Sequence, residues 1–217
     1  MEKILRGMIN TMDSVKSPRM TALRELHEAE TGGPLSILIG TILSARTRDE
    51  NTSSVVKKLF AKYKTARALA RAKVSDVEKI IKSTGFYHVK ARRIIKVASL
   101  IDSQYSGKVP NNLDELLKLP GVGRKTANCV LVYAFDKPAI PVDTHVHRIS
   151  NRLGLVETKT PEETEFALMK KIPKKYWLKI NDTFVMYGQN ICKPISPMCD
   201  VCQLKNDCKY YKTTLAS

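Results

Sequence analysis

Apolar side chains recur three and four positions apart along most of the chain, which is the spacing of an amphipathic helix. Prolines and glycines separate these stretches, and no stretch shows the two-residue alternation of a half-buried strand. The pattern predicts helices over 1–17, 35–43, 52–63, 65–72, 75–82, 143–153 and 174–188, with others around 23–27, after 90, on both sides of 120–123 and from 160. The predicted fold class is all-α.

Three of these helices carry more specific signals. Leu35 to Leu43 is apolar almost all round, which predicts a helix buried on every side at the centre of a helical layer. Ser75 and Glu78 stand three positions apart before an apolar run, which predicts a capping box at the start of 75–82. On the first helix, Met8 and Ile9 are expected to share one apolar face with their neighbours at helical spacing.

Polar and basic loops interrupt the helices at two places. The segment 44–51 follows the central apolar helix and is placed either to touch a ligand or to form a plain solvated turn. The segment 84–90 joins a glycine to Phe86, Tyr87 and Lys90, a mixture that can stack on a displaced base. For each aromatic ring taken alone, closing the core is the simpler interpretation.

The pattern over residues 113–132 predicts a helix, a tight glycine turn and a second helix. Pro120 ends the first helix, and Gly121 and Gly123 can both supply a positive φ and open the second helix with its positive dipole end. Backbone N–H groups at such a turn can hold a phosphate oxygen, so the segment predicts a helix-hairpin-helix that grips a nucleic-acid backbone. An ordinary αα-hairpin that binds nothing has the same pattern.

Lys125 lies in the first turn of the second hairpin helix, on the face opposite its apolar stripe. The positive end of a helix dipole disfavours a cation, which lowers the cost of losing the proton. A neutral amine there could act as a nucleophile, whereas the alternative is a solvated lysine that touches phosphate.

Asp143 follows two prolines and is predicted to cap the helix that runs to about Leu153. Its carboxylate could also serve opposite Lys125 as an acid, a base or an electrostatic stabiliser of a cation. His145 and His147 face different sides of this helix, so no metal pair is expected from them.

Composition points to a polyanionic partner. The 217 residues contain 37 Lys and Arg against 21 Asp and Glu, a net charge of +16 spread along most of the chain. No apolar run is long enough to span a bilayer, and the N-terminus lacks a signal-peptide core. We therefore expect an intracellular protein of the cytoplasm or nucleoid with reduced thiols, no membrane partner and a monomeric state.

Four of the five cysteines fall within the last 26 residues, in the pattern C-x6-C-x2-C-x5-C. They are Cys192, Cys199, Cys202 and Cys208. Thiolates this close together in a reducing compartment indicate a metal centre. Zinc sites usually combine two CxxC-like knuckles and only one CxxC is present, so a [4Fe–4S] cluster is favoured over zinc.

The hairpin Leu-Pro-Gly-Val-Gly-Arg-Lys-Thr-Ala, the segment Val-Asp-Thr-His at 142–145 and the four-cysteine tail together resemble the endonuclease III family of DNA glycosylases. The resemblance extends from about Leu35 to Cys208, and Asp143 follows Lys125 by the 18 positions that this family shows. It implies that Lys125 is the catalytic amine and Asp143 the catalytic carboxylate. It also implies a [4Fe–4S] cluster on the four tail cysteines.

The function implied is a bifunctional DNA N-glycosylase with apurinic/apyrimidinic lyase activity, which removes oxidised pyrimidines from double-stranded DNA in base-excision repair. The damaged nucleotide would be flipped out and attacked at C1′, and β-elimination would then break the strand. The expected DNA contacts are Gly121, Val122, Gly123, Arg124, Thr126, His145 and Arg46. Arg46 stands where the family often has a glutamine that fills the space of the flipped base, so lesion range or opposite-base preference can differ.

The resemblance also implies a division of the chain into two domains. A six-helix barrel with the helix-hairpin-helix would cover 27–137, and a second helical domain with the cluster loop would combine 1–26 and 138–217. The DNA groove, with Lys125 and Asp143, would lie between them.

The sequence is also compatible with two alternatives. One is a monofunctional or mismatch-specific glycosylase of the same fold, although such enzymes typically have no lysine at the position of Lys125. The other is a non-catalytic helix-hairpin-helix DNA-binding or redox module, which would bind DNA in a salt-sensitive way without releasing bases.

Overall fold

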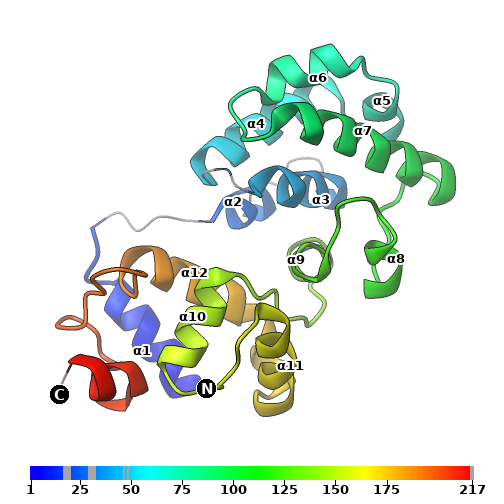
Figure 1. Cartoon of the computed structure of the whole chain (residues 1–217). Coiled ribbons are helices and arrows are strands. Elements are labelled where there is room, and N and C mark those ends of the chain that lie inside the picture. The colour runs from blue at the N-terminus through cyan, green and yellow to red at the C-terminus, as the bar shows by residue number, and fades with distance from the viewer. Residues whose placement is uncertain (17–20, 29–32, 46, 48, 216–217) are drawn as a thin grey trace. The chain divides into compact units, whose positions relative to one another are not determined.

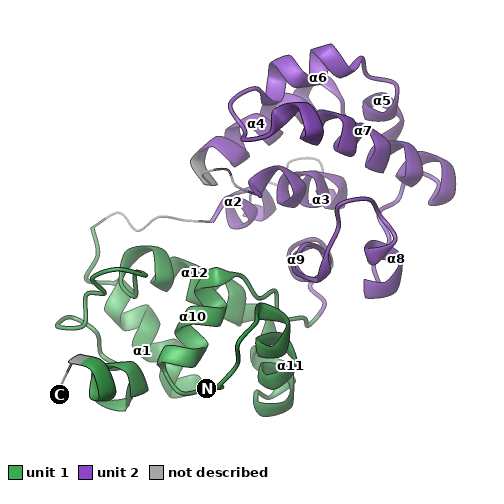
Figure 2. Ribbon diagram, viewed as in Figure 1, with its two compact units in different colours: residues 1–20, 138–217 green, residues 21–137 purple. Residues whose placement is uncertain are grey.

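A computed structural model describes residues 1–16, 21–28, 33–45, 47 and 49–215 (Figure 1). These described residues form helices and connecting turns without any β-strand, so the predicted all-α fold class is confirmed. None of their helices is both long and apolar enough to cross a membrane. The chain divides into two compact units, Thr21–Lys137 and Met1–Met20 with Pro138–Ser217, which we call the middle unit and the terminal unit (Figure 2).

The middle unit is organised around one fully buried helix. Its helices are α2 (Ala22–Glu28), α3 (Gly33–Ser44), α4 (Asp49–Lys62), α5 (Ala66–Ala70), α6 (Val74–Ile81), α7 (Tyr87–Gln104), α8 (Leu113–Leu117) and α9 (Arg124–Phe135). Helix α3 packs against α2, α4, α7 and α9, and every residue from Leu35 to Leu43 is buried. The prediction of a central helix buried on all sides is confirmed.

The start of α6 differs from the predicted capping box. Helix α6 begins at Val74, its N-cap is Lys73 and no side chain caps it, so Ser75 lies inside the helix. Glu78 instead lies 2.8 Å from Nδ1 of His88 at the start of α7. The contact between α6 and α7 therefore uses the carboxylate that the local pattern had assigned to the cap.

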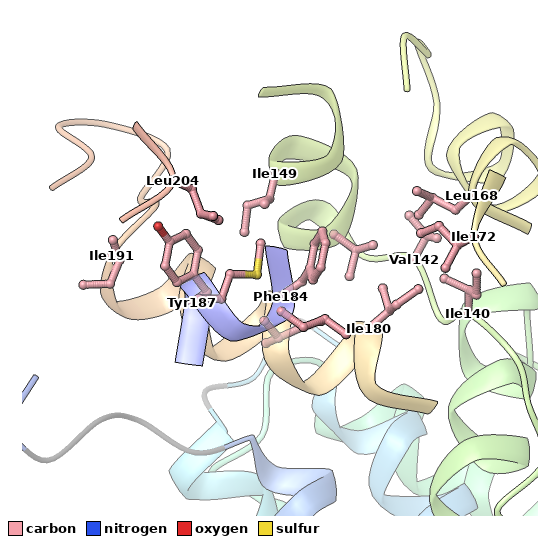
Figure 3. Packing of buried hydrophobic residues seen from close by; sticks show 14 of the residues in the cluster. Ile140, Val142, Ile149, Leu168, Ile172, Ile180, Phe184, Tyr187, Ile191 and Leu204 are labelled. Carbon is pink, nitrogen blue, oxygen red and sulfur yellow. The ribbon is translucent and has the colours of Figure 1, made fainter. Parts of the chain in front are cut away.

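The terminal unit packs its helices around α12. It contains α1 (Glu2–Met12), α10 (Thr144–Arg152), α11 (Pro161–Lys171) and α12 (Trp177–Asn190), followed by short turns of 3-10 helix at Lys205–Asp207 and π-helix at Tyr211–Leu215. Helix α12 packs against α1 and α10, and its Ile180, Phe184 and Tyr187 form the middle of the core (Figure 3). Met8 of α1 is fully buried, but Ile9 is 52% exposed, so the predicted apolar face of α1 does not include Ile9.

The C-terminal cysteine loop is part of this core rather than an appended tail. Leu204 is 3% exposed, and it packs so closely on α1 that a Cβ at Gly7 would come within 2.5 Å of its side chain. The backbone N–H of Gln203 donates a hydrogen bond to Oγ1 of Thr11. The two ends of the chain are thereby joined inside one unit.

Candidate active site

The hairpin turn joins α8 to α9 in the middle unit. Gly121 has a φ of +77°, a conformation that a side chain would strain, and a Cβ there would also meet the Arg93 side chain of α7 at 2.4 Å. Gly123 has a φ of −93° and serves as the N-cap of α9 without any side-chain cap. The expectation of a positive φ is therefore confirmed for Gly121 and wrong for Gly123.

The same turn presents backbone donors to the surface. Gly121 and Gly123 are exposed, and within the described residues no acceptor takes either N–H. The N–H of Val122 donates to the Leu119 carbonyl, and its side chain is only 6% exposed. Val122 thus anchors the turn in the core while the two glycine amides remain available to an anion.

The first turn of α9 carries the predicted nucleophile. Lys125 is exposed, whereas its neighbours Arg124 and Thr126 are half-buried. The buried face of α9 from Ala127 to Tyr133 packs against α3, which fixes the direction in which this first turn points. A rigid helix therefore positions the amine, as a nucleophile requires.

Asp143 caps α10 in the terminal unit, which confirms the capping prediction. Its Oδ1 accepts hydrogen bonds from the backbone N–H groups of His145 and Val146, each at 2.9 Å. Within the described part of the chain, Oδ2 accepts none, and the residue is half-buried. One carboxylate oxygen thus holds the helix and the other remains available for chemistry.

The side chains that follow Asp143 turn toward α12. The His145 ring lies so near α12 that a Cβ at Gly188 would come within 2.6 Å of its Nδ1. Nη2 of Arg148 donates to the carbonyls of Cys192, at 2.8 Å, and Gly188, at 3.1 Å. Burial lowers the pKa of Arg148 below its ordinary value, an effect that the nearby Cys192 opposes. Arg148 was not predicted as a site residue, because its bonds to Gly188 and Cys192 join segments about forty positions apart in the chain.

The four tail cysteines gather at one end of the terminal unit. They line a single cavity together with Tyr187 and Arg152. All four are free thiols, and no three Cys, His, Asp or Glu side chains in the described residues converge to hold a single metal ion. The thiols surround the cavity rather than meet at its centre.

Two polar side chains form hydrogen bonds with two of these sulfurs. The Tyr187 hydroxyl lies 2.8 Å from Sγ of Cys202, and Nη1 of Arg152 lies 3.5 Å from Sγ of Cys192. Burial, followed by the hydrogen bond with Cys202, raises the pKa of Tyr187, so its hydroxyl stays protonated and either atom of the pair can be the donor. Tyr187 and Arg152 were not predicted as site residues, because an aromatic ring or an arginine at helical spacing carries no signal of a neighbouring sulfur.

The turn before α7 does not place both of its aromatic rings in the core, which was their simplest interpretation. Phe86 is 62% exposed with a φ of +58°, so it does not close the core, and Tyr87 is half-buried. The left-handed position belongs to Phe86 and not to Gly85. Arg46, predicted to contact DNA, lies outside the described residues.

Comparisons with known proteins agree over most of the chain. Residues 39–174 match the model of the HhH-GPD superfamily of base excision DNA repair proteins. The endonuclease III of Thermotoga maritima is 55% identical over 179 residues, which cover 82% of this chain and 84% of that protein. The chain belongs to the endonuclease III family. By that membership it is a DNA glycosylase and lyase of base-excision repair.

Solved structures of an endonuclease III and of a second DNA glycosylase show the same fold. A trapped covalent intermediate of an endonuclease III with DNA is 37% identical, with a TM-score of 0.82 over 97% of this chain and 95% of that chain. A thermostable thymine-DNA glycosylase is 27% identical with the same TM-score, over 97% of this chain and 96% of its own. The resemblance that the hairpin and the tail cysteines indicated is confirmed.

Proposed function

We propose that this endonuclease III family member removes oxidised pyrimidines from duplex DNA, with Lys125 as the nucleophile and Asp143 as the carboxylate that assists it. The observation that carries the proposal is the position of Lys125, exposed in the first turn of α9 directly after the hairpin turn. An amine there would stand beside the phosphate that the Gly121 and Gly123 amides hold. The covalent DNA intermediate of a 37% identical relative is consistent with a nucleophilic mechanism.

The proposed chemistry has two stages. The Lys125 amine attacks C1′ of a flipped-out nucleotide while the glycosidic bond breaks and the base leaves with its electron pair, to be protonated. Asp143 stabilises the positive charge that develops on the sugar and assists proton transfer through its uncommitted Oδ2. The sugar opens to a Schiff base, and loss of a C2′ proton expels the 3′ phosphate, which breaks the strand.

The remaining contacts would hold the distorted DNA. The exposed, basic surroundings of the hairpin bind backbone phosphate, and the exposed Phe86 can stack on a base at the lesion. Arg46 would occupy the space that the flipped base leaves and donate to the orphaned partner base, which makes the opposite base a determinant of activity.

A panel of duplexes tests the lesion class. We expect base release and strand cleavage with thymine glycol, strand cleavage at a preformed abasic site, and release at least about a hundredfold slower with 8-oxoguanine, because its larger ring does not fit a pyrimidine pocket. The measurement is denaturing gel electrophoresis of labelled strands with and without alkali. Efficient release of uracil or of a mismatched thymine without strand cleavage would contradict the proposal.

That last outcome would favour the second candidate function, a monofunctional mismatch glycosylase. The similarity to the thermostable thymine-DNA glycosylase supports this candidate, since both matches have the same TM-score. An exposed lysine in the first turn of α9 favours the bifunctional reaction, because a mechanism that uses only water needs no amine at that position.

We also propose that Cys192, Cys199, Cys202 and Cys208 hold a [4Fe–4S] cluster. Such a cluster binds its four thiolates through four different irons, so its ligands surround it, as these thiols surround their cavity. Burial, followed by the neighbouring thiolates, raises the pKa of Cys199, and the positive charge of bound iron would stabilise the ionised sulfurs. When bound, the cluster would cross-link the loop to α12 and supply no step of base release.

Replacing Cys199 with Ser is expected to remove most of the bound iron and to destabilise the terminal unit, because a missing ligand opens the cross-link. Iron and sulfide content and visible absorbance measure the first effect, and thermal unfolding measures the second. Cys129→Ala is the matched control, because Cys129 is buried in α9 of the middle unit. One zinc per chain, or no difference between the two variants, would contradict the cluster assignment.

A further inference from the structure

Helix α7 carries a buried lysine that the proposed chemistry does not use. Lys90 is only 4% exposed and lies on the apolar face of α7, one turn before the buried Ile94. Its Nζ donates three hydrogen bonds, to the carbonyls of Leu43, at 2.8 Å, and Ala45, at 2.7 Å, and to Oγ1 of Thr47, at 2.8 Å. All three acceptors belong to the end of α3 and the loop that follows it.

Part of this arrangement is explained by the needs of α3. The last carbonyls of a helix have no partner within it, and its C-terminus favours a cation. The last turn of α3 contains no basic residue, so Lys90 supplies both the donor and the charge from another helix. This accounts for the bond to Leu43 but not for the bonds to Ala45 and Thr47, which lie beyond the helix.

Those two bonds hold the residues on either side of Arg46 in the chain, Ala45 by its backbone carbonyl and Thr47 by its side-chain hydroxyl. Ala45 and Thr47 are its immediate neighbours, and the family resemblance assigns Arg46 the space vacated by the flipped base. A single ammonium thus ties both flanks of the predicted base-replacing residue to a rigid helix.

The next turn of α7 reaches the other predicted DNA-contacting segment. The Arg93 side chain lies against Gly121 of the hairpin turn, and no acceptor within the described residues takes a hydrogen bond from its guanidinium. Burial, followed by the charge of Arg93, lowers the pKa of Lys90 to about 8. Two cations one turn apart repel each other, and burial also disfavours the charged form of Lys90. The three hydrogen bonds that its ammonium donates offset this cost.

We propose that Lys90 is a positioning residue for base release, which holds Ala45 and Thr47 in place so that the segment they flank can stabilise the flipped-out nucleotide. The inference rests on the proposed function, because it takes the loop to be the segment that replaces the extruded base. Lys90 acts through the loop and does not touch the reacting atoms.

This role predicts unequal effects on the two activities. Extrusion of an intact planar base breaks its stacking and pairing, so it depends on what fills the gap. An abasic sugar has no base to extract, and its strand cleavage should depend much less on the loop. A role confined to the stability of α3 would lower both activities in parallel or would change only the melting temperature.

The test compares Lys90→Met with wild type on a duplex carrying 5-hydroxycytosine and on the same duplex with a preformed abasic site. We expect kcat/KM for base release to fall about tenfold or more, strand cleavage at the abasic site to change less than about threefold, and the Kd for undamaged duplex to stay the same. Lys96→Met is the matched control, because it removes an exposed lysine from the same helix.

A second variant keeps the test decisive if Lys90→Met does not fold. Thr47→Val removes one loop acceptor and leaves the bond from Lys90 to Leu43 in place, so the cap of α3 persists. We expect a selective loss of about threefold in base release. An unchanged ratio of base release to strand cleavage in Thr47→Val, or a parallel loss in Lys90→Met, would overturn the inference. Wild-type protein inactive on both duplexes would instead remove the proposed function on which the inference rests.

Discussion

Lys125→Gln is expected to abolish the covalent enzyme–DNA adduct that borohydride traps and to reduce strand cleavage at abasic sites by about a thousandfold or more, because the amide cannot form a Schiff base. The side chain is exposed at the surface of α9, so the substitution should leave the melting temperature within about 2 °C of wild type. Gel electrophoresis of trapped adducts and of cleaved strands measures both activities.

The appropriate control is a second exposed lysine of the middle unit. Lys64→Gln removes the same charge from the segment between α4 and α5, so it reports any general loss of DNA affinity. If the Lys125 variant still formed the trapped adduct at the wild-type rate, another amine would be the nucleophile and the assignment would be wrong.

Asp143→Asn separates the capping role that the structure shows from the catalytic role that we propose for the same carboxylate. An asparagine oxygen can still accept the N–H groups of His145 and Val146, so the cap of α10 should persist and cost less than about 1 kcal/mol of stability. The lost negative charge, however, should slow base release by about a hundredfold to ten-thousandfold. Single-turnover base release and thermal unfolding measure the two effects.

Asp143→Ala is the comparison that completes this test. It removes the charge and the cap together, so we expect the same loss of base release and an additional loss of up to about 2 kcal/mol of unfolding free energy. Equal base release in wild type and Asp143→Asn would show that Asp143 serves only the helix. Equal stability of the Asn and Ala variants would show that the cap contributes little.

Local sequence patterns predicted the elements whose causes are local. The cap at Asp143 is set by residues within three positions, and its side chain accepts the expected backbone N–H groups. The apolar run from Leu35 to Leu43 is buried throughout, because a helix without a polar face can be stable only where every side is covered.

Patterns failed where a tertiary partner competed with a local one. Ser75 and Glu78 have the spacing of a capping box, yet Glu78 binds His88 of the next helix and the helix begins before Ser75. Phe86 has the side chain of a core residue, yet the turn before α7 places it in the left-handed conformation and exposes it. Neither outcome is visible within a window of a few residues, because the deciding contacts join different helices.

By itself, the sequence determined the all-α class, the hairpin turn, the cap at Asp143, the four grouped cysteines and, through its motifs, the family. Each of these depends on residue types at short, fixed spacing. Only the tertiary structure decided that Arg148 and Arg152 bind the backbone of the cysteine loop and that the Tyr187 hydroxyl forms a hydrogen bond with Cys202. It also decided that Lys90, a lysine on the apolar face of α7, caps α3 and holds the loop after it. These side chains find partners more than ten positions away, and such distances are set by how helices pack and not by the order of residues along the chain.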